Sequence, residues 1–158
     1  MHDYTLQNEQ LVHLLGGSDD FLVNCAQFSA FVYHGLRDLN WAGFYFLRDG
    51  VLSLGPFQGK VACTPIALGD GVCGASVASA KSIVVPDVHD FSGHIACDSA
   101  SRSELVVPLI MKNHILGVFD LDSPLVDRFS EQDREGVTLL VTTLLGVTRF
   151  PDSWGQLL

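Results

Sequence analysis

The first part of the chain, from about residue 7 to residue 37, has apolar residues at helical spacing. Ser18 is the expected N-cap of one helix, with Asp19 and Asp20 in its first turn, where carboxylates interact favourably with the helix dipole. The apolar stripe of this helix consists of Phe21, Cys25, Phe28 and Val32. Because Cys25 lies on this stripe, we expect a core position for it.

The middle of the chain predicts strands joined by tight turns. Residues 40–47 are rich in aromatic side chains, and the Asp49-Gly50 pair that follows is a strong signal for a two-residue hairpin turn. Further strands are expected at about 51–54, 61–66, 82–85, 104–111 and 114–122, and a short helix at 71–80. Residues 86–103 show no apolar periodicity, and loops of this length in compact domains are usually functional.

The order of these elements predicts an α+β fold. An amphipathic helix is expected at the end, because an apolar stripe over residues 137–145 follows a capping-box pattern at Ser130 and Asp133. A chain of 158 residues predicts one domain. We expect it to comprise N-terminal helices (1–38), a sheet with active-site loops (39–129) and a C-terminal helix (130–148).

Composition and charge exclude several classes of protein. Eighteen Asp and Glu residues against nine Lys and Arg give a formal charge of −9, which disfavours nucleic acid and anionic membranes as partners. The first residues lack the pattern of a secretory signal, and the longest apolar stretch, 137–147, is shorter than the roughly 20 residues that a membrane span needs. We therefore expect a cytoplasmic protein whose four cysteines are thiols at rest.

Most residues with candidate chemistry lie between positions 86 and 122. Asp120 and Asp122 interrupt an apolar strand, and they face the same side because strand side chains alternate. Such a pair alone is more often a solvated strand end, but the nearby long loop and its thiol favour a chemical role. Crowded carboxylates raise one another's pKa, so one member of a group that includes Glu104 can stay protonated and donate a proton.

The cysteines have different sequence environments. Cys97 lies among small and polar residues in GHIACDSAS, which suits an accessible, reactive thiol better than core packing. Cys63, in KVACTPI, could meet Cys97 in space, although the sequence alone does not show that they meet. For Cys73 a core position is the simpler interpretation.

Three other patterns allow alternative interpretations. His89, His94 and Cys97 have a spacing that matches no standard zinc pattern, so the metal signal is weak. Trp41 and Tyr45 share one strand face, either as ordinary sheet packing or as an aromatic wall for a methyl or thioether group. Glycines at 69, 71 and 74 match a dinucleotide pattern but lack its strand–helix–strand context, and we discount it.

Several segments together resemble the free methionine-R-sulfoxide reductases, which are single GAF domains that reduce free methionine sulfoxide. These segments are NWAGFYFL, LGPFQGKVACTPI, GDGVCG, VVPDVHDFSGHIACDSASRSELVVPL and LGVFDLDSP. The resemblance extends from about residue 39 to residue 135. It implies a GAF-like six-stranded antiparallel sheet flanked by helices, and usually a homodimer.

The resemblance also implies roles for individual residues. Cys97 corresponds to the catalytic cysteine, Cys63 to the resolving cysteine and Cys73 to a third family cysteine. The substrate contacts that it implies are the carboxyl groups of Glu104, Asp120 and Asp122 and the aromatic rings of Trp41 and Tyr45. Cys25 inherits no role.

These roles, together with the chemistry of the residues, lead to a hypothesis for catalysis. Glu104 with Asp122 polarises the sulfoxide oxygen, Asp120 helps to hold the substrate ammonium, and Cys97 attacks the sulfur. Cys63 then forms a disulfide with Cys97, with Cys73 as an alternative or relay thiol, and thioredoxin is the expected reductant. No metal or organic cofactor is expected. A small-molecule-binding or redox-sensing GAF module without turnover is the alternative.

Overall fold

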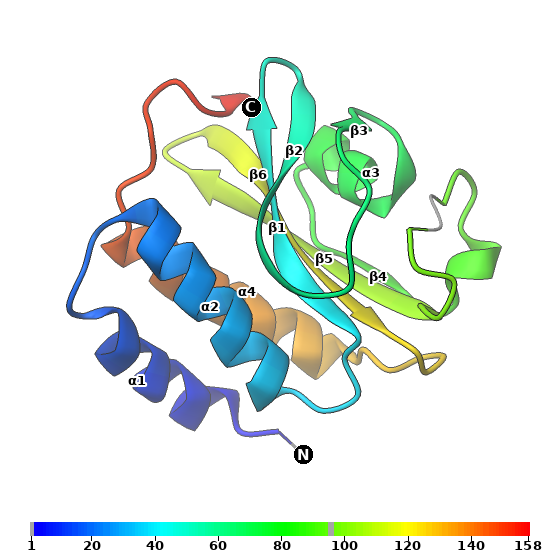
Figure 1. Cartoon of the computed structure of the whole chain (residues 1–158), viewed down its shortest axis with the longest axis horizontal. Coiled ribbons are helices and arrows are strands. Elements are labelled where there is room, and N and C mark those ends of the chain that lie inside the picture. The colour runs from blue at the N-terminus through cyan, green and yellow to red at the C-terminus, as the bar shows by residue number, and fades with distance from the viewer. Residues whose placement is uncertain (1, 95–96) are drawn as a thin grey trace.

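The computed structural model describes residues 2–94 and 97–158, in which a twisted sheet carries helices on both faces (Figure 1). The helices of these residues are α1 (Tyr4–Leu15), α2 (Phe21–Gly35), α3 (Gly71–Ser79) and α4 (Glu131–Val147), with a 3-10 helix η1 at Val88–Asp90. Their strands are β1 (Trp41–Arg48), β2 (Val51–Gly59), β3 (Ile66–Ala67), β4 (Ile83–Val85), β5 (Ser103–Met111), β6 (His114–Ser123) and β7 (Gln156–Leu157). None of the helices in this part of the chain is long and apolar enough to cross a membrane.

The strands pair in the order β3-β2-β1-β6-β5-β4, and each pair is antiparallel. Over the described residues this confirms the expected six-stranded antiparallel sheet, to which the two-residue β7 is added beside the start of β6. The expected tight turns are present. Asp49 and Gly50 have φ angles of 51° and 78°, and Lys112 and Asn113 have φ angles of 50° and 63°. Positive φ at both central residues matches the right-handed twist of a hairpin.

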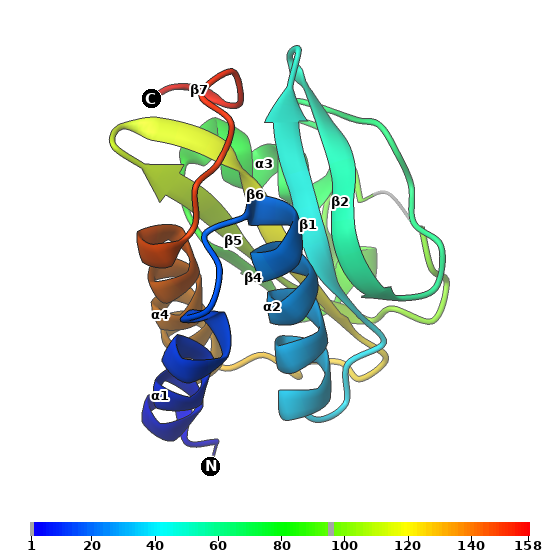
Figure 2. The same ribbon diagram turned by 60° about the vertical axis from the view of Figure 1, so that its left-hand side comes forward.

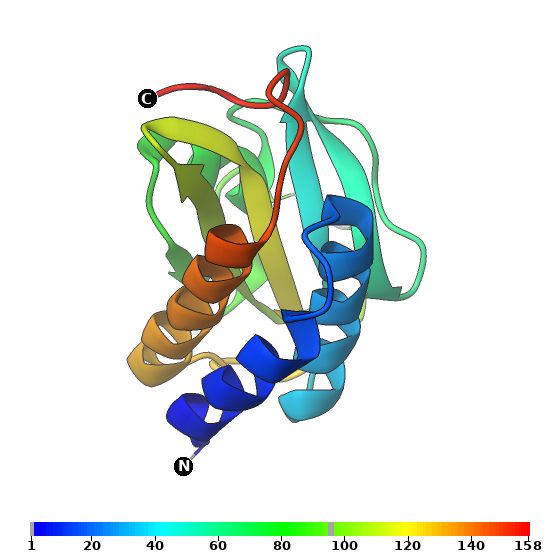
Figure 3. The same ribbon diagram turned by 90° about the vertical axis from the view of Figure 1, so that its left-hand side faces the viewer.

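Each face of the sheet has its own apolar core. Helices α1, α2 and α4 cover one face and α3 covers the other (Figures 2 and 3). Phe28 from α2 packs against Phe44 and Phe119 on the first face, with ring centroids 5.6 and 4.8 Å apart. Because side chains alternate along β1, Tyr45, the residue after Phe44, faces α3 instead. The α3 face is therefore the one that receives Trp41 and Tyr45.

The start of α2 differs from the prediction. Its N-cap is Asp20 rather than Ser18, and the Asp20 carboxylate accepts the backbone N–H of Val23 at 3.0 Å. Ser18 instead accepts the backbone N–H of Asp20 at 3.1 Å, so both residues stabilise the turn before the helix. Cys25 is fully buried among the apolar residues of the helical face, as expected.

Two predictions for the loops need correction. The expected strand at 61–66 is wrong, because only Ile66–Ala67 forms a strand and pairs with β2. The backbone before it is bound by side chains of β1 rather than by a strand: the Trp41 Nε1–H donates to the carbonyl of Lys60, at 3.1 Å. The long loop at 86–103 contains η1, and its residues 95 and 96 lie outside the described part of the chain.

The C-terminal tail closes the end of the helical face. Trp154 packs edge-to-face on Phe21 and also contacts Phe46, with centroids 4.8 Å apart in both pairs. The Arg48 guanidinium lies 5.2 Å from the Trp154 ring, a cation–π contact. The tail thereby joins α2 to the sheet.

Gly43 provides a test of how the sheet positions its aromatic residues. A Cβ atom there would lie 2.3 Å from the Phe57 Cβ and 2.7 Å from the Trp41 ring. Gly43→Ala should therefore force Trp41 to move and lower the free energy of unfolding by about 1–3 kcal/mol.

The matched control is Gly146→Ala in α4, where an added Cβ meets nothing within 4 Å. This variant should be neutral or stabilised by up to about 1 kcal/mol, because alanine favours helix. Urea unfolding measures both. Equal stability of the two variants would show that Gly43 is not needed for this packing.

Candidate active site

Three carboxyl groups from two neighbouring strands meet on the α3 face of the sheet. Glu104 on β5 is paired with Asp122 on β6, and Asp122 is paired with Trp41 on β1. Asp120 lies one row further along, opposite Gly43. Directly paired residues point to the same face of a sheet, so the register alone brings these side chains together.

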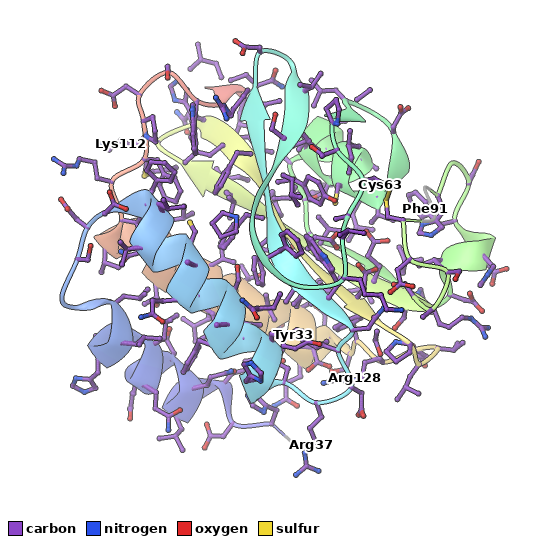
Figure 4. The ribbon with its side chains drawn as sticks, in the orientation of Figure 1. Tyr33, Arg37, Cys63, Phe91, Lys112 and Arg128 are labelled. Carbon is purple, nitrogen blue, oxygen red and sulfur yellow. A yellow bond between two sulfur atoms is a disulfide. The ribbon has the colours of Figure 1, made fainter. Side chains whose placement is uncertain are left out.

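These residues line one pocket that encloses about 570 Å³, including the part open to solvent. Its chemically active lining is Trp41, Tyr45, Cys73, His94, Cys97, Glu104, Asp120 and Asp122. Figure 4 shows Cys63 on the α3 side of the molecule, away from helices α1 and α2. The site residues predicted from the sequence thus lie on β1, α3, β5, β6 and two loops.

Cys63 and Cys97 form a disulfide at this pocket. The bond joins two loops that are 34 residues apart in sequence, and the Cα atoms are 5.5 Å apart. Cys97 is exposed and Cys63 is half-buried, so the disulfide is accessible from solvent. Cys73 and Cys25 are free and buried, Cys73 inside the pocket wall and Cys25 in the opposite core.

The segment that follows Cys97 is fixed by polar side chains. The Asn40 amide donates to Asp98 Oδ2 at 3.2 Å and to Ser101 Oγ at 3.0 Å. Asp98 also accepts the backbone N–H of Ala100 at 2.9 Å, which lowers the pKa of Asp98. Sequence reasoning missed Asn40 and Ser101, because 61 residues separate them and no motif connects them.

The other end of the same loop is held by Asp87. Its carboxylate accepts hydrogen bonds from Arg102, at 2.9 Å, and from the backbone N–H of His89, at 3.1 Å. The exposed imidazole of His89 lies 2.8 Å from Asp87 and is oriented by it. Among the described residues, His89, His94 and Cys97 are not a group whose donor atoms lie close enough together to hold a metal ion.

One other group has donor atoms close enough to hold a cation. Within the described residues, donor atoms of Cys73, Glu104 and Asp120 lie within 4.8 Å of one another. Burial raises the pKa of the Cys73 thiol well above its ordinary value, and the nearby Asp120 and Glu104 raise it further. The group therefore favours protonated side chains in the free protein.

Burial dominates the electrostatics of the carboxyl groups. It raises the pKa of Glu104 well above its ordinary value, and the charges of Asp120 and Asp122 raise it further. The pKa of Asp122 is raised in the same way. Burial raises the pKa of Asp120 to about 7, although hydrogen bonds from Cys73 and Glu104 oppose the rise. At least one proton is therefore expected to remain in the cluster at neutral pH.

Two further observations define what the pocket can bind. In the part of the chain that the structure describes, no Lys or Arg lines the pocket, and the buried Asp120 Oδ1 has no hydrogen-bond partner. His94 Nδ1 lies 3.8 Å from Glu104 Oε2, and burial lowers the pKa of His94, so this imidazole is neutral near pH 7. The site is therefore suited to a ligand that carries a positive charge.

The aromatic side of the pocket suits an apolar group. Trp41 and Tyr45 are stacked, with ring centroids 5.7 Å apart and an interplanar angle of 25°. A ligand with an ammonium group and an apolar tail could thus contact the acids and the rings at once. A neutral carboxylic acid beside the Cys63–Cys97 disulfide is also able to donate a proton to an oxygen atom of a bound ligand.

The chain is similar to known proteins over most of its length. The family model described as GAF domain matches residues 26–145. The free methionine-R-sulfoxide reductase of Escherichia coli is 50% identical over 141 residues, which cover 89% of this chain and 86% of the relative.

Solved structures give the same result. The free methionine-R-sulfoxide reductase of Neisseria meningitidis, in complex with its substrate, is 36% identical, has a TM-score of 0.87, and is matched over 90% of this chain and 86% of that chain. The reduced form of fRMsr of Staphylococcus aureus is 40% identical, has a TM-score of 0.91, and is matched over 94% and 97% of the two chains.

The raised pKa of Asp120 predicts how stability depends on pH. A raised pKa in the folded state stabilises the fold below the ordinary value of 3.8, and this contribution is lost as the pH rises to about 7. Because asparagine does not ionise, Asp120→Asn should gain stability relative to wild type over this range, on the order of 1–3 kcal/mol.

Unfolding free energies measured at several pH values test this expectation. The same substitution at the exposed Asp152 controls for the loss of one negative charge. A stability difference for Asp120→Asn that stays constant with pH would show that Asp120 does not titrate in this range.

Proposed function

Because the chain belongs to the free methionine-R-sulfoxide reductase family of GAF domains, we propose that it reduces free methionine-R-sulfoxide to methionine. The observation that carries this proposal is the Cys63–Cys97 disulfide beside a pocket with three carboxyl groups. A disulfide of this kind is the product of the proposed reaction. The acids supply the proton that the sulfoxide oxygen needs.

The substrate is oriented by its two ends. The ammonium group of free methionine sulfoxide binds the carboxylate of Asp120, whose Oδ1 atom has no hydrogen-bond partner in the free protein. The S-methyl group lies against the stacked rings of Trp41 and Tyr45. A peptide-bound methionine sulfoxide inside a chain has no free ammonium, so the same contacts favour the free amino acid.

The chemistry then follows in two steps whose atoms and electrons balance. The Cys97 thiolate attacks the sulfoxide sulfur while Glu104, assisted by Asp122, protonates the oxygen. In the resulting adduct the protonated oxygen passes from the substrate sulfur to the Cys97 sulfur, and the bonds of the substrate sulfur to that oxygen and to Cys97 break. Methionine leaves and Cys97 becomes a sulfenic acid, so that Cys97 is oxidised by two electrons and the sulfoxide is reduced by two. The Cys63 thiol displaces this oxygen as water and forms the disulfide.

Cys73 is a secondary thiol in this proposal. It is buried beside Asp120 and Glu104, and its raised pKa keeps it protonated. The pairing of Cys63 with Cys97 supports Cys63 as the main resolving residue. Cys73 is left as an alternative or relay thiol.

The remaining partners follow from the same proposal. An external dithiol protein, thioredoxin, reduces the disulfide and completes the cycle. The family resemblance supports a homodimer, and the presence of two free cysteines supports a cytoplasmic location. There the enzyme would repair methionine that has been oxidised under oxidative stress.

Substitution of the cysteines separates the two steps. Without reductant, Cys63→Ser should release about one equivalent of methionine and accumulate a sulfenic acid, because the second thiol is missing. Cys97→Ser should release none. Amino-acid analysis measures methionine, and labelling with dimedone detects the sulfenic acid.

Cys25→Ala is the matched control, because Cys25 lies in the opposite core. It should behave as the wild type does. Release of methionine by Cys97→Ser would contradict the proposed function.

Glu104 is tested through the pH dependence of turnover. A general acid contributes about 10²–10⁴-fold, so Glu104→Gln should lower kcat by at least about 100-fold. Wild-type kcat should fall at alkaline pH, as Glu104 loses the proton that its raised pKa retains at neutral pH. Glu104→Gln should lack this alkaline fall.

Dithiothreitol as reductant keeps these measurements independent of thioredoxin. A near-normal rate with Glu104→Gln would exclude Glu104 as the acid.

A further inference from the structure

Val61 is an exposed apolar residue beside the disulfide. Its exposed fraction is 88%, the highest value among the large apolar residues that the structure describes. It lies two residues before Cys63, at the mouth of the pocket. Single exposed apolar residues are common on protein surfaces, so exposure alone assigns no role to Val61.

The backbone on both sides of Val61 is fixed. On one side the Trp41 Nε1–H donates to the carbonyl of Lys60, at 3.1 Å. On the other side the Tyr45 hydroxyl donates to the carbonyl of Cys63, at 2.9 Å. Thr64 Oγ1 also accepts the backbone N–H of Leu54, at 3.3 Å. Val61 is therefore presented by an ordered loop, although its own side chain packs against little of the protein.

The position of Val61 beside the disulfide means that a protein reductant would cover its side chain. A protein thiol that attacks the Cys63–Cys97 disulfide has to bring its sulfur into contact with one of these two sulfur atoms. Cys97 is exposed and lines the same pocket as Val61, which is two residues from Cys63 along the same loop. The surface around an attacking protein thiol would therefore cover the Val61 side chain. A small dithiol needs no such contact.

We propose that Val61 is the docking contact for the protein dithiol that reduces the Cys63–Cys97 disulfide. The partner presents an apolar surface around its attacking cysteine, and Val61 is buried against that surface. Lys60, whose side chain is 76% exposed, lies next to Val61, and its Nζ is 3.9 Å from Asp98 Oδ2, so the charges at the edge of this contact are paired within the protein. This inference rests on the recycling step of the proposed function.

The exchange reaction balances without any other reactant. One partner thiolate attacks a sulfur of the disulfide, the bond between Cys63 and Cys97 breaks, and a mixed disulfide forms. The second partner thiol attacks the mixed disulfide, displaces the cysteine that is still bonded to the partner and closes a disulfide within the partner. The partner is oxidised by two electrons, and Cys63 and Cys97 are reduced to thiols.

The test measures reduction of the preformed disulfide, with no methionine sulfoxide present. Oxidised protein is mixed with increasing concentrations of reduced thioredoxin, and newly exposed thiols are counted by maleimide labelling and mass spectrometry. Val61→Ser should lower the second-order rate constant with thioredoxin about tenfold, because the apolar contact is lost. The rate constant with dithiothreitol should stay within about twofold of wild type, because a small thiol needs no docking contact. Val61→Leu should retain the thioredoxin rate.

Leu22→Ser is the matched control. Leu22 is 57% exposed and lies on α2, which covers the opposite face of the sheet. This variant should react like wild type with both reductants.

The outcomes are separable. An unchanged thioredoxin rate for Val61→Ser would overturn the docking proposal, and so would an equal loss of rate with both reductants. The assay contains no sulfoxide, so inactivity of the wild type towards methionine sulfoxide would contradict the proposed function and leave the docking result in place.

Discussion

Two buried carboxyl groups and one half-buried one, with no Lys or Arg lining their pocket in the described part of the chain, are the constraint on which the rest of this site depends. Glu104, Asp120 and Asp122 are on neighbouring strands, and the antiparallel register of β5 and β6 brings them together. Leaving all three ionised in this environment would be unfavourable, because burial and mutual repulsion both oppose charge. The cluster must therefore retain protons or bind a cation. Both behaviours are useful to an enzyme that binds an amino acid and protonates its oxygen.

The fold can accommodate these three acids because the sheet separates two apolar cores. On one face, α1, α2 and α4 bury a large apolar cluster that includes Phe28, Phe44 and Phe119. On the other face, the smaller cluster around α3 borders the pocket, and polar residues interrupt it. The helical face can stabilise the domain while the α3 face keeps its buried acids. The raised pKa values of these acids show that burying them lowers the stability of the fold at neutral pH, and the same burial lets the site retain a proton.

Local patterns in the sequence predicted a large part of this arrangement. The alternation of side chains placed Asp120 and Asp122 on one face, and the Asp49-Gly50 pair identified the hairpin between β1 and β2. The start of α2 was misplaced because Ser18 and Asp20 are both good capping residues, and only the three-dimensional structure decides between them.

Features that depend on long-range contacts could not be predicted. The loop before β3 is shaped by hydrogen bonds from Trp41 and Tyr45 to backbone carbonyls, and such acceptors have no sequence signature. The same is true of Asn40, which holds a segment about 60 residues away. The pairing of Cys63 with Cys97 was expected from the family resemblance and not from the residues alone, and the structure contains this disulfide.

The central claim is that the carboxyl cluster holds a proton at neutral pH before substrate binds. Infrared difference spectroscopy of the reduced, ligand-free protein measures this directly, because a protonated carboxylic acid has a carbonyl band that a carboxylate lacks. We predict such a band at pH 7 in the wild type, its loss at alkaline pH, and its weakening in Glu104→Gln. A spectrum that shows only ionised carboxylates at pH 7 would contradict this account.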